Sequence, residues 1–135
     1  MSDLKEAIKY LTILVEEILD DTLNRSDFSD LTHHQLNYLK AIIRMKNPTI
    51  SELALELKLT KPTVTVMIDK LEAKGYVKKV KSDEDRRCSH LHIDNKGEQI
   101  NDMLDNVHEE LSRKISIKLN DTETRILMEL LKKIV

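Results

Sequence analysis

The stretch from Thr49 to Gly97 constrains the fold more than any other part of the sequence. It contains two short helical patterns joined by a tight turn at residues 57–59, and then two strand patterns around a charged turn. Thr49 and Thr60 stand where helix N-caps are expected, because a threonine hydroxyl can accept a hydrogen bond from a free N–H of the first turn. Gly75 stands where the second helix should end. We therefore expect a helix-turn-helix followed by a β-hairpin.

Long amphipathic helices are expected on both sides of this stretch, because apolar residues recur there at intervals of three and four. Thr32 and Gln35 form a capping-box pattern that opens one of them. Thr49 and Glu52 repeat that pattern. The predicted fold is a winged helix-turn-helix, mainly α with a small β-hairpin wing and with further helices at both ends. The expected helices cover residues 3–23, 32–47, 49–57, 60–75, 94–119 and 120–134, and the strands cover 76–81 and 89–93.

Composition limits the class of protein. A chain of 135 residues with 34% charged residues fits one globular domain. Its single cysteine excludes an internal disulfide and a multi-cysteine zinc site, and fits a reducing compartment. The sequence has no apolar run of about 18 residues that would span a membrane, and no secretory signal at its start. We expect a cytoplasmic protein without cofactor or metal. The sequence contains no catalytic-nucleophile motif and no phosphate-binding loop, so we do not expect an enzyme.

The basic residues are concentrated in the middle of the chain. The net charge is −2, but residues 44–96 contain 12 Lys and Arg against 8 Asp and Glu, a net +4. The remaining residues contain 10 against 16, a net −6. DNA binding requires a local basic surface rather than a basic protein, so this distribution permits it. Scatter of charge in a helical protein explains the same distribution equally well.

The second helix of the helix-turn-helix presents a polar face. Val64, Met67 with Ile68, and Leu71 form its inward stripe, and polar residues lie opposite. Threonine hydroxyls and methyls can contact base edges, so this face can read DNA; the alternative is a solvated face. The expected DNA-contacting residues at this helix are Thr60, Lys61, Pro62, Thr63, Thr65, Val66 and Lys70.

The hairpin adds a basic tip. Lys81 ends its first strand, and Arg86 and Arg87 lie in the turn. Asp85 stands two residues before Arg87, close enough to hold its guanidinium by a charge-assisted bond. An arginine held in this way can enter a narrow minor groove. Two further carboxylates in the turn oppose this interpretation, because they repel phosphates; the alternative is a charged hairpin exposed to solvent.

The terminal helices carry wider apolar stripes than one small core would cover. Such an excess is typical of surfaces that bury against a partner. We therefore expect a homodimer joined through residues 1–30 and 95–135, with a DNA-binding lobe at 31–94. The alternative is an ordinary intramolecular bundle. A second alternative is a module whose winged helix binds protein; it needs an apolar outer face, for which only Val66 qualifies.

At the hairpin, the sequence resembles the MarR family of transcription regulators. Residues 85–94, DRRCSHLHID, are similar to the family pattern D-x-R-x5-L-T, with Asp85 and Arg87 matching directly. Ile93 and Asp94 replace its leucine and threonine. The resemblance covers essentially the whole chain. The other similar stretches are residues 50–54 (ISELA), 63–65 (TVT) and 69–77 (DKLEAKGYV).

The resemblance implies a homodimeric repressor that binds a pseudo-palindromic double-stranded DNA operator. Val66 stands where the family often has an arginine, which puts one contact in question. The resemblance also implies a ligand cleft between the dimerisation helices and the DNA-binding lobe. His34 and Tyr38 share a helix face in that region. Together with Leu11 and Val15 they form a candidate site for a small amphipathic or aromatic effector that releases DNA; plain packing is the alternative.

Cys88 and the histidines are further candidates. Cys88 lies beside two arginines, a setting that favours a redox-reactive thiol; an inert wing residue is the alternative. His90 and His92 share one strand face, but no complete set of metal ligands accompanies them. We expect structural or solvent-exposed histidines.

Overall fold

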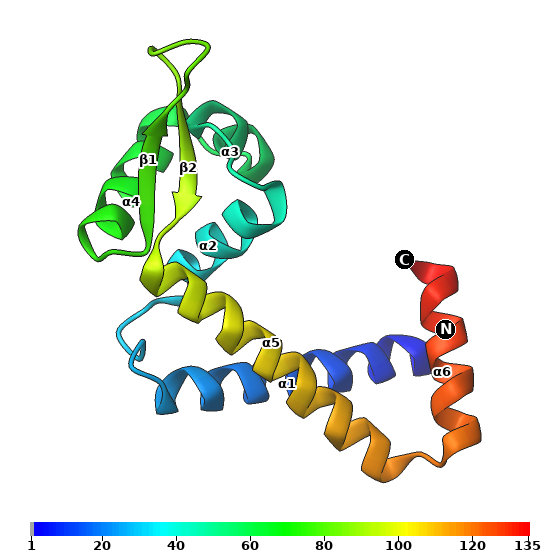
Figure 1. Cartoon of the computed structure of the whole chain (residues 1–135). Helices are drawn as coiled ribbons and strands as arrows, with labels where there is room; N and C mark the ends of the chain where they lie inside the picture. The colour runs from blue at the N-terminus through cyan, green and yellow to red at the C-terminus, as the bar shows by residue number, and fades with distance from the viewer. Residues whose placement is uncertain (1) are drawn as a thin grey trace. The chain divides into compact units, whose positions relative to one another are not determined.

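A computed structural model describes the backbone of residues 2–135 and the side chains of residues 3–135. Within these residues the chain forms helices and one two-stranded antiparallel sheet (Figure 1). The predicted winged helix-turn-helix fold and its element order are confirmed. The elements are α1 (Ser2–Arg25), α2 (His33–Met45), α3 (Ile50–Leu57), α4 (Lys61–Ala73), β1 (Val77–Lys81), β2 (Ser89–Ile93), α5 (Asn95–Lys118) and α6 (Asp121–Ile134). In this described part of the chain, no helix has the length and apolar character needed to cross a bilayer.

The chain forms two compact units. The winged unit contains residues Phe28–Asp102, which include α2, α3, α4, both strands and the start of α5. The helical unit contains the chain up to Asp27 and the segment Met103–Val135, which include α1, the rest of α5 and α6.

The winged unit has a closed apolar core. Every one of its helices and strands contributes a side chain that is at most 1% exposed. Burying such side chains is the main driving force for packing these elements together. The predicted inward stripe of α4 forms part of this core. The core side chains at this level of burial include Leu36, Leu39, Ile42, Leu53, Val64, Ile68, Leu71, Val77, Leu91 and Ile100.

Of the two predicted capping boxes, the one at α2 is complete and the one at α3 is not. At α2, the hydroxyl of Thr32 accepts the N–H of Gln35 at 3.0 Å, and Oε1 of Gln35 accepts the N–H of Thr32 at 3.1 Å. This confirms the capping box there. At α3, the hydroxyl of Thr49 accepts the N–H of Glu52 at 3.1 Å, but the Glu52 carboxylate accepts from that hydroxyl at 3.2 Å instead of from the backbone. The second capping box is therefore only half formed.

The wing is attached along β2 to the chain before α3. β2 pairs with β1 along its whole length. On its other side, His90 forms a bridge with Thr49, and the N–H of Leu91 donates to the carbonyl of Pro48 at 2.7 Å. These contacts fix the wing beside the start of α3.

Both glycines lie where the wing joins the neighbouring helices. Gly75 has φ +84°, which confirms it as the residue that ends α4. Gly97 lies in the first turn of α5, where a Cβ would collide with the carbonyl oxygen of Tyr76 and with Cγ2 of Ile93. A side chain at position 97 would therefore displace the base of the wing.

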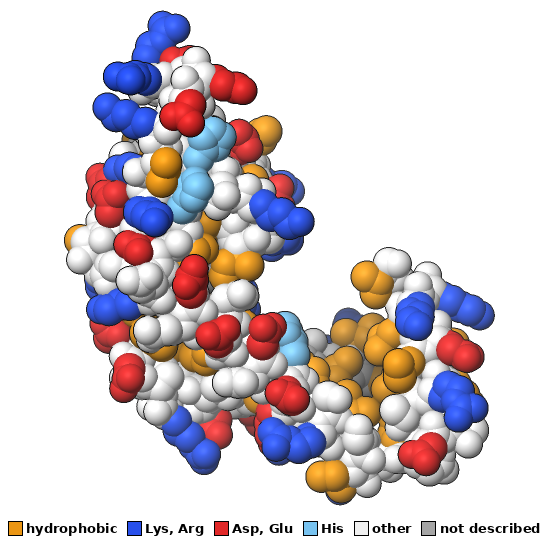
Figure 2. Space-filling model, in the orientation of Figure 1, with side chains coloured by type: hydrophobic (Ala, Val, Ile, Leu, Met, Phe, Trp, Pro, Cys, Tyr) orange, Lys and Arg blue, Asp and Glu red, His pale blue; other side chains and the backbone are white. Residues whose placement is uncertain are grey.

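The helical unit leaves much of its apolar surface exposed. Its most buried side chains come from the second half of α1 and from α5, whereas none of the described residues of α6 is buried. Figure 2 shows apolar side chains gathered over this unit near the C-terminus. The large apolar residues exposed in this unit are Leu4, Ile8, Tyr10, Leu11, Ile13, Ile117, Ile126, Met128, Leu130, Leu131, Ile134 and Val135.

Candidate nucleic-acid interface

α4 presents the polar outer face that the sequence predicts. Its N-cap, Thr60, accepts the N–H of Thr63 at 3.4 Å, and Pro62 lies in the first turn, where no N–H is needed. Thr65 is partly exposed. The exposed members of the predicted set are Thr60, Lys61, Pro62, Thr63, Val66 and Lys70. All seven predicted residues therefore lie outside the core, where a ligand can reach them.

The threonine hydroxyls on this face already have partners. Oγ1 of Thr65 donates to the carbonyl of Lys61 at 2.9 Å, and the hydroxyl oxygens of Thr60 and Thr63 lie 2.7 Å apart. A hydroxyl has a single proton, so Thr65 retains only acceptor capacity. The amino groups of adenine and cytosine are the donors that such an acceptor can recognise in the major groove.

Asp85 organises the tip of the wing. Its Oδ1 accepts the N–H of Arg87 at 3.0 Å and Nε of the same arginine at 3.3 Å. Its carbonyl accepts the N–H of Cys88 at 3.0 Å. The predicted bond between Asp85 and the guanidinium is confirmed. The Arg87 side chain is 92% exposed, and because only its Nε is bonded to Asp85, its NH2 groups can bind a further acceptor.

The wing tip carries both signs of charge. Lys81 and Arg86 are exposed at the same end of the hairpin as Arg87. Figure 2 shows basic and acidic side chains side by side around the end of the hairpin. Asp83 and Glu84 are exposed there too. Contact with phosphates would therefore depend on the position of each cation rather than on a uniformly basic patch.

A groove of about 430 Å³ lies between the wing and the first turns of α3 and α4. Lys61 lines it from α4 and Arg87 from the wing tip. Ser51 lines it from the first turn of α3, where backbone N–H groups lack intrahelical acceptors. Lys79 and the carboxylate of Glu52 line the groove as well, so its cations favour a phosphate group while Glu52 opposes one. Sequence reasoning missed this groove because its residues lie far apart in the chain.

The predicted effector residues belong to different units. On α1 of the helical unit, Leu11 is exposed and Val15 is partly exposed. On α2 of the winged unit, the rings of His34 and Tyr38 meet edge to face with centroids 5.3 Å apart, so they share a face as expected. The Tyr38 hydroxyl is buried without a hydrogen-bond partner among the described residues, and burial raises the pKa of Tyr38. Such an orphaned hydroxyl requires an explanation, for example a bound ligand or water.

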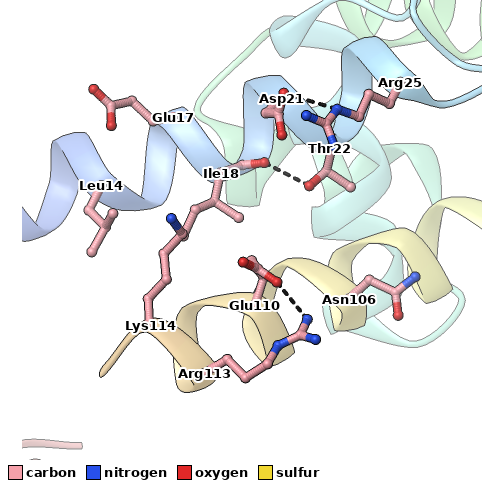
Figure 3. A pocket seen from close by; sticks show the side chains of 10 residues that line it. All are labelled: Leu14, Glu17, Ile18, Asp21, Thr22, Arg25, Asn106, Glu110, Arg113 and Lys114. Atoms are coloured by element: carbon pink, nitrogen blue, oxygen red, sulfur yellow. Dashed lines mark hydrogen bonds and ion pairs between the residues drawn. The ribbon is translucent and has the colours of Figure 1, made fainter. Parts of the chain in front are cut away.

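A cavity of about 510 Å³ in the helical unit was not indicated by the sequence (Figure 3). Leu14 and Ile18 of α1 give it an apolar side, and Lys114 of α5 extends toward them. The ion pairs on its rim are Asp21–Arg25 and Glu110–Arg113. The apolar side and the amine of Lys114 can together accommodate an amphipathic anion.

The remaining candidates have structural contacts. Cys88 is exposed, with Sγ 4.0 Å from Oδ2 of Asp85. Nδ1 of His90, in β2, lies 3.0 Å from the carbonyl oxygen of Asn47. Among the side chains described, no group of three His, Cys, Asp or Glu residues is arranged to hold a metal ion.

Comparison with known proteins finds similar transcriptional regulators. The chain is 28% identical over 99 residues to the HTH-type transcriptional regulator BilQ of Clostridioides difficile (strain CD3), a match that covers 73% of this chain and 67% of BilQ. The transcriptional regulator Tm0710 of Thermotoga maritima is similar in structure, with a TM-score of 0.79, 25% identity and coverage of 99% and 92% of the two chains. FabT of Streptococcus pneumoniae, solved in complex with DNA, gives a TM-score of 0.72, 28% identity and coverage of 97% and 94%.

A helix-turn-helix whose second helix exposes a polar face beside a basic-tipped hairpin defines a winged helix-turn-helix transcriptional regulator. Residues 31–89, which run from the start of the winged unit into β2, match the model of the MarR family. This match identifies residues 31–89 as a winged helix-turn-helix region of the MarR type.

Proposed function

We propose that this protein is a homodimeric repressor that acts in the cytoplasm and binds a pseudo-palindromic double-stranded DNA operator. The observation that carries the proposal is Arg87, held by Asp85 at the exposed tip of the wing, in the same unit as the polar face of α4. The solved complex of the similar protein FabT with DNA supports this assignment. Each part of the interface has its own role.

α4 is the recognition helix of this proposal. Thr63, Thr65 and Val66 would meet base edges in the major groove, the first two by hydrogen bonds and the third by apolar contact with thymine methyls. Lys61 and Lys70 would bind phosphates and fix the register. Thr60 and Pro62 shape the first turn that brings them to the backbone.

The wing would contact the adjacent minor groove. Arg87 enters the groove, and its bond to Asp85 reduces the conformational entropy lost on binding. Lys81 and Arg86 would bind the flanking phosphates. The groove between the wing and α3 offers Lys61 and Arg87 a shared phosphate.

The proposed dimer is supported by the apolar surface of α6. Leu127 and Leu131 line a cavity of about 270 Å³ with α5, and Leu131 is still 47% exposed. Ile126 and Leu130 do not line it and are 50% and 49% exposed. A second copy of the chain would cover them. Two-fold symmetry would then place two recognition helices on half-sites about 10 base pairs apart.

Selection of bound DNA from a random pool tests this function. We expect an inverted repeat whose half-sites lie about one helical turn apart, and an affinity that falls steeply with salt as counterions are released. Failure to enrich any DNA would refute the proposal. Enrichment of single half-sites would refute the dimeric mode while keeping DNA binding. A winged helix that binds protein by apolar contact would lack the steep salt dependence.

We further propose that a small amphipathic or aromatic anion releases the operator by binding beside His34 and Tyr38 of α2. The buried, unpartnered hydroxyl of Tyr38 supports this site. The effector must prefer one of two states of the protein, because equal affinity for both shifts nothing.

Titration of phenolic and acyl carboxylates, with operator affinity and thermal stability recorded together, tests the effector site. A ligand that acts equally on the wild type and on Tyr38→Ala would exclude it. The cavity between α1 and α5 is the competing location, and Lys114→Gln tests it in the same titration.

A further inference from the structure

β1 carries three lysines, and one of them has a different environment. Nζ of Lys79 lies 2.6 Å from Oδ1 of Asp69 and 3.9 Å from Oε1 of Glu72. Its side chain is only 30% exposed. The pKa of Lys79 is raised, mainly because its ammonium group donates a hydrogen bond to Asp69. Lys78 and Lys81 are exposed and have no ion pair within the described part of the chain.

The backbone at the same residue is also bonded to α4. Lys79 lies opposite Leu91 in the hairpin, and the N–H of Leu91 points away from β1, toward Pro48. Lys79 and Leu91 therefore form a non-hydrogen-bonded pair of the antiparallel hairpin. In such a pair the N–H of Lys79 points away from β2. It donates to Oε2 of Glu72 at 3.3 Å. β1 is thus fixed to α4 by one side chain and one main-chain group of the same residue.

We propose that Asp69, Glu72 and Lys79 form a clasp that sets the position of the wing relative to the recognition helix, and that Lys79 positions the wing instead of binding a phosphate. The inference rests on the proposed DNA binding, because only a protein that uses both elements on DNA needs their separation fixed. Recognition helix and wing must match two adjacent grooves at once.

The clasp also neutralises an acidic residue on the DNA-facing helix. Asp69 is exposed, and an unpaired carboxylate there repels phosphates. The carboxylates of Asp69 and Glu72 already offset the charge of the Lys79 ammonium, so a phosphate loses part of the attraction that an unpaired cation would offer. Lys81 and Arg86 can bind phosphates without that loss. Lys79 is therefore the wing cation least suited to contact DNA.

Hydrogen exchange in the free protein tests the clasp without DNA. In Asp69→Asn and Lys79→Gln, the amide of residue 79 should exchange about two- to five-fold faster, the range expected for loss of a partly exposed ion pair. Lys78→Gln, a matched change on the same strand, should leave that amide unchanged. Equal exchange in the wild type and in Asp69→Asn would overturn the clasp.

The salt dependence of affinity for the selected operator tests the role of Lys79. Removing a carboxylate near DNA normally strengthens binding, whereas we expect Asp69→Asn and Lys79→Gln to weaken it about two- to five-fold with an unchanged salt slope. Lys79→Arg should retain affinity. Lys81→Gln, which removes a phosphate contact, should reduce the slope by about 0.9.

Two outcomes would overturn the positioning role. One is stronger binding by Asp69→Asn, and the other is a loss of slope in Lys79→Gln equal to that in Lys81→Gln. If the wild type binds no DNA, the proposed function fails, and the exchange measurement still decides whether the clasp exists.

Discussion

The winged unit and the helical unit differ in how completely they bury their apolar residues. In the winged unit, all elements contribute side chains that are at most 1% exposed. In the helical unit, the most buried side chains, Leu23 and Val107, are 4% exposed, and α6 buries none of its described residues. Exposed apolar surface of this extent favours association. The difference supports the proposal that a second copy of the chain covers the helical unit, whereas the winged unit buries its apolar residues by itself.

The strongest test of this comparison places charge on α6. We expect Ile126→Glu combined with Leu130→Glu to abolish the dimer, because burying unpaired carboxylates costs several kcal/mol. Light scattering at micromolar concentration should give the 15.7 kDa mass of one chain. The spectra of the winged unit should remain native. Arg125→Glu adds a carboxylate elsewhere on the same helix and should keep the dimer; a dimeric double variant would mean that this surface is not the interface.

Within the winged unit, the largest functional loss is expected at the wing tip. Arg87→Ala should weaken operator binding by about 1–3 kcal/mol, the range for one specific arginine contact. Because the side chain is 92% exposed, the free energy of unfolding should not change. Asp85→Ala should cause a smaller loss, since the arginine remains but is no longer held. Anisotropy titrations at physiological salt measure both variants, and unchanged affinity in Arg87→Ala would remove the wing from the interface.

A smaller effect, on preference rather than on affinity, is expected at the recognition helix. Thr65→Val keeps the shape of the side chain and removes its acceptor oxygen. Together with Thr63→Ala, it should reduce discrimination at the contacted bases by about 1–3 kcal/mol. A repeated selection from the random pool measures this change. Lys70→Gln should weaken all sequences uniformly, and an identical motif from the threonine variant would mean that α4 does not read the bases.

The smallest effect is expected at Tyr38, whose hydroxyl is buried in the winged unit without a hydrogen-bond partner among the described residues. Tyr38→Phe removes a buried hydroxyl that has no partner among the described residues, so it should stabilise the protein by about 1 kcal/mol. Urea unfolding measures the difference. A loss of stability instead would show that a bound water or ligand pairs with the hydroxyl.

The same residue gives a dependence on pH. Burial raises the pKa of Tyr38 and Tyr76 above the ordinary value of 10.0. Above that pH the unfolded chain loses these protons first, so the native state binds more protons and stability falls as pH rises. Tyr38→Phe should show a shallower fall than the wild type, and identical slopes would contradict the burial effect.

Local signals in the sequence predicted the elements of the winged unit well. Thr60 and Gly75 set the ends of α4 because a hydroxyl caps the first turn and a glycine adopts positive φ after the last. The contact between Asp85 and Arg87 followed from a spacing of two residues. The predicted end of α2 was late, since the helix stops at Met45 and the next two residues have positive φ.

Contacts between distant parts of the chain could not be predicted. The bond between Lys79 and Asp69 depends on how β1 lies against α4, which no local pattern encodes. The partner of the Thr65 hydroxyl depends on its rotamer. The cavity between α1 and α5 joins segments about ninety residues apart, and its polar rim has no sequence motif. The orphaned hydroxyl of Tyr38 becomes evident only once its surroundings are known.

The two glycines limit how this wing can evolve. The chain contains only Gly75 and Gly97, and they border the same short junction, the first by its backbone angle and the second by its lack of a side chain. Insertions and charge changes at the tip leave that junction intact, so tip length and DNA preference can drift between lineages. Any side chain at position 97 would instead collide with Ile93 and with the backbone carbonyl of Tyr76, and no substitution at residue 76 can remove that oxygen. The tip can therefore accept substitutions that the junction cannot.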